Sequence, residues 1–134
     1  MLDHHSALIY AMVLASAADQ EMNDEEVEMM SEIIKFLPAF RDYDLNQLSS
    51  TARSCAEMLR DEEGLELAIE KIRQSLSEPL CETAYALACD VVAADGTATQ
   101  EELRLLELLR HRLDVPRLEA AAIERGAAAR FRQV

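Results

Sequence analysis

Two stretches of the sequence decide the fold: ALIYAMVLASAADQEMNDEE at residues 7–26 and TAYALACDVVAADGTATQEE at residues 83–102. Each begins with a nearly apolar run, continues into a short polar segment and ends in two glutamates. When the two are aligned, Ala17-Ala18-Asp19 matches Ala93-Ala94-Asp95, and Glu25-Glu26 matches Glu101-Glu102. The match predicts a duplicated helix–acidic loop–helix unit, with pseudo-repeats at about residues 7–37 and 83–113 that pack about a pseudo-two-fold axis.

Composition favours helices outside the repeats as well. Half of the 134 residues are apolar and only 3 are Gly and 3 are Pro, whereas the strong helix formers Ala, Leu, Met and Glu abound. Apolar residues recur at helical spacing, and no segment alternates with a period of two. We therefore expect a single all-α domain over residues 1–134, with about seven helices. They are expected at about residues 4–18, 23–37, 80–94 and 99–113, with two connecting helices within about 45–76 and a last helix beginning at Pro116.

Capping residues mark where several of these helices begin. Asn23 with Glu26, and Thr99 with Glu102, have the spacing of a capping box, in which each side chain of the pair accepts a bond from the other residue's backbone N–H. Asp44 predicts the start of a third helix in the same way. The two capping boxes fall at equivalent positions of the two repeats.

The formal net charge of −13 is distributed unevenly along the chain. No Lys or Arg precedes Lys35, whereas the segment from Arg110 onward holds six arginines and three acidic residues. A surface this acidic repels phosphate backbones and anionic lipids. We therefore expect neither a nucleic-acid partner nor membrane insertion. The expected partners are a cation, a basic protein surface, or a second copy through the Arg-rich C-terminal segment.

The cysteines and the N-terminal segment indicate the compartment. Cys55, Cys81 and Cys89 are odd in number and form no C-x-x-C pattern, which predicts buried reduced thiols. Residues 1–20 lack the basic segment and cleavage site of a signal peptide. The apolar run at residues 7–18 is shorter than the ~20 residues that span a bilayer. We therefore expect a cytoplasmic protein.

The acidic loops carry the candidate site. Asp95 continues the helical stripe that includes Val91, so we expect its carboxylate near the buried face, and Asp19 is placed in the same way. The dipole at a helix C-terminus disfavours a carboxylate by roughly 0.3–1 kcal/mol. Such a group needs hydrogen-bond donors or a cation. Asp19 with Glu26, and Asp95 with Glu102, are therefore candidate ligands of a divalent cation.

Two interpretations of these loops stay open. If the hairpins meet, four carboxylates converge, and hard cations such as Ca²⁺, Mg²⁺ or Mn²⁺ suit such oxygens. Alternatively, each Asp accepts bonds from N–H groups of the following turn and each Glu only completes its capping box. The loops are not EF-hands, because Met30 and Leu106 stand where loops beginning at Asp19 and Asp95 require a glutamate.

The sequence offers little for catalysis or for an organic cofactor. His4 and His5 lie at an N-terminus that we expect to fray, and His111 is expected on a helix surface. There is no G-x-S-x-G motif and no glycine-rich phosphate loop. Tyr10 and Tyr85 are expected in the core. We therefore expect a binding protein rather than an enzyme.

The Ala-Asp-Gly motif at residues 94–102, which follows an apolar helix and ends in Glu, resembles the TerB-like tellurite-resistance family. So do its weaker copy at residues 18–26 and the connecting stretch at residues 64–69; the similarity covers about Ala7 to Pro116. The resemblance implies a compact helical domain with two similar halves and a role in bacterial responses to tellurite or other stress. It also implies that divalent metal binds at Asp19, Glu26, Asp95 and Glu102.

One position departs from the family pattern. The Gly that follows the Asp is present as Gly96 in the second half but is replaced by Gln20 in the first. If that Gly supplies a positive φ, Gln20 carries a steric cost, so the second loop is expected to be the more reliable site.

Three functional hypotheses follow, in order of preference. The first is a cytoplasmic TerB-like domain that binds Ca²⁺, Mg²⁺, Mn²⁺ or Zn²⁺ through its acidic loops. The second is a metal-free acidic module for protein–protein interaction. The third, an enzyme that uses a metal-bound water, is disfavoured because no group capable of proton transfer is placed beside the loops.

Overall fold

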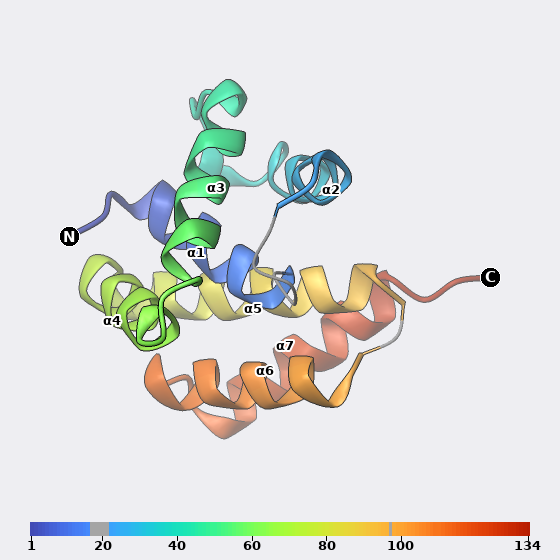
Figure 1. The fold of residues 1–134 in the computed structure, drawn as a ribbon. Coiled ribbons are helices and arrows are strands. Elements are labelled where there is room, and N and C mark those ends of the chain that lie inside the picture. The colour runs from blue at the N-terminus through green and yellow to red at the C-terminus, as the bar shows by residue number, and fades with distance from the viewer. Residues whose placement is uncertain (17–21, 97) are drawn as a thin grey trace.

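The structure is a computed structural model that describes residues 1–16, 22–96 and 98–134. These residues form seven α-helices and no β-strand, which confirms the all-α prediction (Figure 1). As far as the chain is described, no helix is long and apolar enough to cross a membrane. In chain order the helices are α1 (His4–Ser16), α2 (Asp24–Ile34), α3 (Leu48–Met58), α4 (Gly64–Ser75), α5 (Glu78–Ala94), α6 (Gln100–Arg112) and α7 (Arg117–Arg130).

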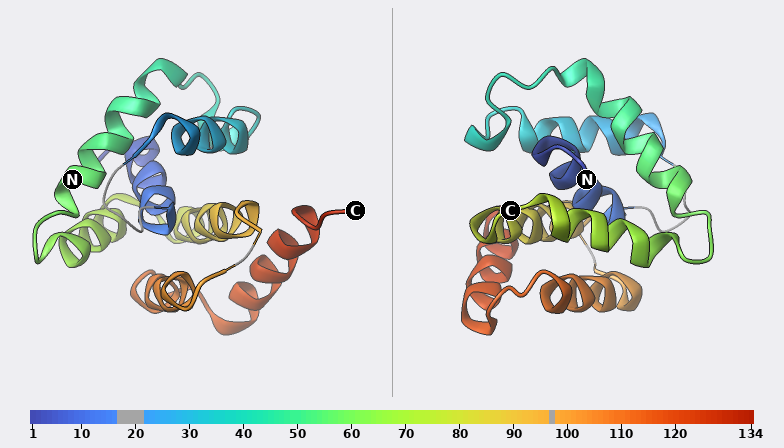
Figure 2. Two further views of the ribbon diagram at one scale, coloured as in Figure 1. Left: turned by 45° about the vertical axis from the view of Figure 1, so that its right-hand side comes forward. Right: turned by 90° about the vertical axis from the view of Figure 1, so that its left-hand side faces the viewer.

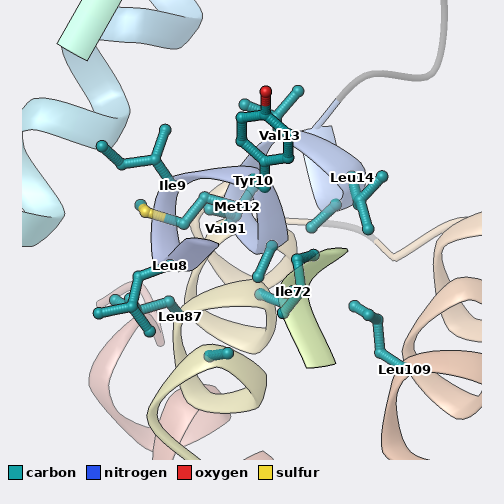
Figure 3. Close-up of a cluster of buried hydrophobic side chains, with 14 of the residues drawn as sticks. Leu8, Ile9, Tyr10, Met12, Val13, Leu14, Ile72, Leu87, Val91 and Leu109 are labelled. Carbon is teal, nitrogen blue, oxygen red and sulfur yellow. The ribbon is translucent and has the colours of Figure 1, made fainter. Parts of the chain in front are cut away.

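Helix α1 lies at the centre of the core. Every residue from Ala7 to Ala15 is buried, because α3, α4, α5 and α6 all contact this helix. Leu8, Ile9 and Val13 leave it in different directions (Figure 3). A helix that is covered on every side explains why residues 7–15 show no polar face. Each large side chain that is fully buried contributes about 1.5–3 kcal/mol.

The two predicted repeats correspond to the hairpins α1–α2 and α5–α6. In each hairpin the first helix supplies most of the buried residues, and the second buries only two. The hairpins also contact each other reciprocally, because α1 packs on α5, α1 contacts α6 and α2 contacts α5. The connecting helices α3 and α4 also contact α1. The common origin of the two halves stays a prediction.

Helix α7 extends beyond the second hairpin. From its turn with α6 it runs towards the C-terminal end of α5, so that α6 and α7 diverge along their length (Figures 1 and 2). Two polar contacts connect α7 to α5: the Tyr85 hydroxyl donates to Glu124 Oε2, and Arg130 Nη2 lies 2.7 Å from Asp90 Oδ1. The buried apolar residues of α7 are alanines, Ala120 and Ala127. Buried alanines, the partly buried Ile123 and these polar contacts therefore hold this helix.

Two helix boundaries differ from the prediction. Helix α2 ends at Ile34 instead of Leu37, because the chain tightens there and Leu37 N donates to Ile34 O at 3.0 Å. Asp44 does not cap an α-helix directly. Its side chain accepts from Asn46 N at 3.0 Å, which is the i+2 bond of an Asx turn, and a 3₁₀ turn at Leu45–Gln47 then leads into α3.

The expectation that His5 lies in a frayed end is wrong. His5 belongs to α1, its ring nitrogen Nε2 lies 3.0 Å from Ala39 O, and it is only half exposed. Its ring stacks on Phe40 at a centroid distance of 5.3 Å and contacts the ring of Tyr43 at 5.0 Å. The aromatic residues of the α2–α3 connection therefore hold the start of α1 in place.

Candidate functional site

The second acidic loop begins where α5 ends, at Ala94. Asp95 still has right-handed helical torsions, with φ −74° and ψ −16°. Gly96 has a φ of +89°, and its N–H donates to Ala93 O at 3.1 Å. A β-carbon at Gly96 would meet nothing within 4 Å, so glycine is favoured here by the left-handed torsion and not by lack of space. This turn directs the chain away from α5 towards α6.

The expectation that Asp95 lies near the buried face is wrong, because Asp95 is exposed. Burial declines along the last turn of α5: Val92 is buried, Ala93 and Ala94 are partly buried, and Asp95 and Gly96 are exposed. The C-terminal end of α5 therefore extends beyond the helices that pack on it. Asp95 continues the helical spacing of the apolar stripe, but it faces solvent and not protein. Its carboxylate therefore has no desolvation cost that a cation would have to offset.

Both predicted capping boxes are present, and they fix the two glutamates. Thr99 N donates to Glu102 Oε1 at 2.8 Å, and Glu102 N donates to Thr99 Oγ1 at 3.1 Å. In the first half, Asn23 N donates to Glu26 Oε1 at 3.1 Å, and Glu26 N donates to Asn23 Oδ1 at 2.8 Å. Each carboxylate is thereby held on the first turn of its helix by Oε1, with Oε2 outside the box.

The four predicted ligands are only partly placed. Asp19 lies outside the described residues. Among the residues that are described, no three His, Cys, Asp or Glu side chains are grouped so that they could hold an ion. Glu26, Asp95 and Glu102 therefore do not by themselves form the convergent set that the sequence suggested. The metal ligands stay a prediction.

The donor chemistry of the second loop nevertheless fits a hard cation. Asp95 offers an exposed carboxylate, and Glu102 is half-buried with one oxygen engaged in its capping box. Carboxylate oxygens supplemented by water are the ligands that Mg²⁺ and Ca²⁺ accept. Zn²⁺, which prefers nitrogen and sulfur ligands, is a poorer match for this pair of residues.

The thiols and tyrosines are structural, as expected. All three cysteines are free and buried. Burial raises the pKa of Cys55 and of Cys89 to about 12, so both stay protonated at neutral pH and are poor nucleophiles. Tyr10 and Tyr85 are buried in the core. Burial, and then the hydrogen bond to Glu124, raise the pKa of Tyr85.

The Tyr85–Glu124 hydrogen bond was not predicted from the sequence. It joins residues 39 positions apart, and Glu124 lies in an Ala-rich helix with no clear apolar face. No motif or spacing marks this pair, because the contact depends on how α7 crosses α5.

Comparison with known families finds a match over most of the chain. The family model described as "Tellurite resistance protein TerB" matches residues 5–125. Comparison with curated proteins and with solved structures finds no match. The match extends from the second residue of α1 into α7 and includes both hairpins and the connecting helices. The chain therefore belongs to the TerB family.

Proposed function

We propose that this TerB domain is a cytoplasmic binding protein that holds a divalent cation at its acidic interhelical loops and serves a bacterial response to tellurite or a related stress. The second loop, with Asp95 and Glu102, is the principal site. Asp19 and Glu26 are the corresponding ligands of the first loop. The proposal assigns binding and not catalysis to the domain.

The observation that carries the proposal is the capping box at Glu102. It holds a carboxylate in the first turn of α6, and the exposed carboxylate of Asp95 follows the last residue of α5. The side chain of Glu102 is thus ordered before any ligand arrives, which lowers the entropic cost of binding. The C-terminal end of the α5 dipole and a net charge of −13 both add a negative potential that attracts cations.

Thermal unfolding with cations tests the site. The chelator-treated protein is melted alone and with Ca²⁺, Mg²⁺, Mn²⁺ or Zn²⁺. A ligand that binds only the folded state raises the melting temperature, and at 100 times its Kd it stabilises by about 2.7 kcal/mol. The double substitution Asp95→Asn with Glu102→Gln should remove that rise. Gln at this position still completes a capping box, so the helix start is preserved.

A neighbouring glutamate supplies the matched control. Glu101→Gln removes one exposed charge from the same turn without touching the capping box, so it should leave the cation-induced rise nearly unchanged. If Glu101→Gln removes as much of the cation-induced rise in melting temperature as the double substitution does, the rise comes from the general negative charge of the surface and not from a specific site. A rise that survives the double substitution would refute the site.

A metal-free interaction module is the second candidate, and the exposure of Asp95 favours it, because an exposed carboxylate needs no cation to stay charged. Glu26 and Glu102 each already have a structural role that needs no cation. In that case the exposed acids of α2, such as Glu25, Glu28 and Glu32, would bind a basic protein surface or the Arg-rich segment of a second copy. Size-exclusion chromatography across a salt series distinguishes the two, because an assembly held by exposed charges weakens as salt rises.

A further inference from the structure

A groove with a volume of about 1090 Å³ opens between α5, α6 and α7. Its lining includes Val92, Leu106 and Ala120, which are buried, and Leu103, which leaves 48% of its surface exposed. Pockets that bind small molecules typically measure roughly 300–1000 Å³ and are lined mainly by apolar side chains. The groove matches that description in size and in its apolar floor.

The charged groups of the groove are mainly guanidinium groups. Arg110 at the end of α6 and Arg117 at the start of α7 border it near the turn that joins these helices, and Arg132 borders it near the C-terminus. Two carboxylates are present as well. Glu124 accepts the hydrogen bond from Tyr85, and Glu107 is exposed. Three guanidinium groups and two carboxylates give the lining a formal charge of +1, in a chain whose net charge is −13.

The walls of the groove are fixed to one another. The Tyr85–Glu124 hydrogen bond joins α5 to α7 among the lining residues, and the Arg130–Asp90 ion pair makes a second connection between these two helices. Arg110 Nη1 reaches Val115 O at 3.5 Å, across the turn that joins α6 to α7. These contacts join α5 to α7 at two points and hold the end of α6 to the turn before α7.

We infer that the groove between α5, α6 and α7 binds a small amphiphilic anion, with the apolar body on Val92, Leu103 and Leu106 and the acidic group at the arginines. Guanidinium donors match the oxygens of a carboxylate or phosphate. Removal of an apolar chain from water supplies the driving force along the floor. This site uses neither Asp95 nor Glu102 as a ligand, although their chain neighbours Gly96 and Leu103 line the groove.

Calorimetric titration with three probes tests the chemistry of the ligand. Decanoate carries both the apolar chain and the carboxylate, acetate carries only the carboxylate, and decyltrimethylammonium carries a similar chain with the opposite charge. Decanoate is expected to bind at least ten-fold more tightly than either control. Equal binding of the decyl cation, or no binding of decanoate, would overturn the proposal.

Two pairs of substitutions place the ligand in the groove. Ala121 and Ala122 are both exposed on α7, but only Ala121 lines the groove. Ala121→Trp should therefore fill the groove and weaken decanoate binding, whereas Ala122→Trp should not. Arg117→Glu should weaken binding by roughly 10- to 100-fold, the range of a lost charge-assisted hydrogen bond. Arg125→Glu, at an exposed position that does not line the groove, is its control.

Two further results would contradict the assignment. If the lining and control substitutions weaken binding equally, the ligand binds elsewhere. If sedimentation shows a dimer that Ala121→Trp dissociates, the groove holds a second copy of the chain and not a small anion. Thermal melts of all four variants verify that each is folded before its affinity is compared.

Discussion

The hairpins α1–α2 and α5–α6 share one local design but lie in different surroundings. Both second helices begin with a complete capping box at the same register. Yet α1 is buried along residues 7–15 without interruption, whereas α5 borders a groove and ends in an exposed Asp95. Local sequence therefore determines how each second helix starts. The helices that pack around each hairpin determine that its first helix is enclosed, as α1 is, or borders an accessible groove, as α5 does.

Helix α7 accounts for much of this difference. It packs on α5 and is joined to it by two polar pairs; its buried residues are Ala120 and Ala127, and Ile123 is partly buried against the core. Large apolar side chains would have sealed the α5 side as α3 and α4 seal α1. The small side chains of α7 leave room for the groove instead.

The largest expected effect is a loss of stability at alkaline pH. Cys55 in α3 and Cys89 in α5 each lie beside a buried tyrosine, and burial raises both thiol pKa values from 9.0 to about 12. The unfolded chain therefore releases these protons first as pH rises. The contribution of each buried thiol to the free energy of unfolding is complete below about pH 9. Between about pH 9 and pH 12 it declines by about 1.4 kcal/mol per pH unit.

Urea unfolding at several pH values between 8 and 11 measures this decline. Cys55→Ala and Cys89→Ala should each remove one thiol's share of the slope. If the groove admits water to Cys89, its substitution will leave the slope unchanged while Cys55→Ala reduces it. That result would sharpen the contrast between the enclosed and the accessible hairpin, whereas equal reductions would show that Cys89 is as well sealed as Cys55.

An intermediate effect is expected from the two capping boxes. Asn23→Ala and Thr99→Ala each leave one N–H of a first helical turn, that of Glu26 or Glu102, without its acceptor, which costs about 1 kcal/mol. Because the two boxes have the same geometry, the losses in the free energy of unfolding should agree within about 0.5 kcal/mol. A much larger loss for one of them would mean that its surroundings, and not the box alone, stabilise that helix start.

The sequence was sufficient for those parts of the fold that depend on nearby residues. The capping boxes, the apolar run of α1 and the start of α7 after Pro116 follow from spacing and residue type alone. The exposure of Asp95 could not be read from the same spacing. Helical periodicity predicts which face of the helix a side chain occupies, but not how far along the helix that face is covered by other helices.

The binding surfaces show the same limit. Short acidic motifs pointed to Asp95 and Glu102; Asp95 follows the last residue of α5, Glu102 lies in the first turn of α6, and their role as ligands stays a prediction. The groove depends on the angle at which α7 crosses α5 and on Tyr85 meeting Glu124, which are contacts between distant residues. The Ala-rich sequence of α7 predicted a helix but gave no sign of where it would dock.

The smallest expected effect concerns the ion pair that helps to hold α7 on α5. The side chain of Arg130 is 60% exposed and that of Asp90 is 15% exposed. Exposed pairs contribute roughly 0.2–1 kcal/mol, and the shielding of Asp90 places this one towards the upper end. Arg130→Ala should lower the free energy of unfolding by that amount in low salt, with Arg125→Ala as the exposed control. If α7 is held mainly by this pair, the same substitution will also weaken decanoate binding in the groove; if Ala120 and Ala127 hold it, stability will fall slightly and the affinity will not change.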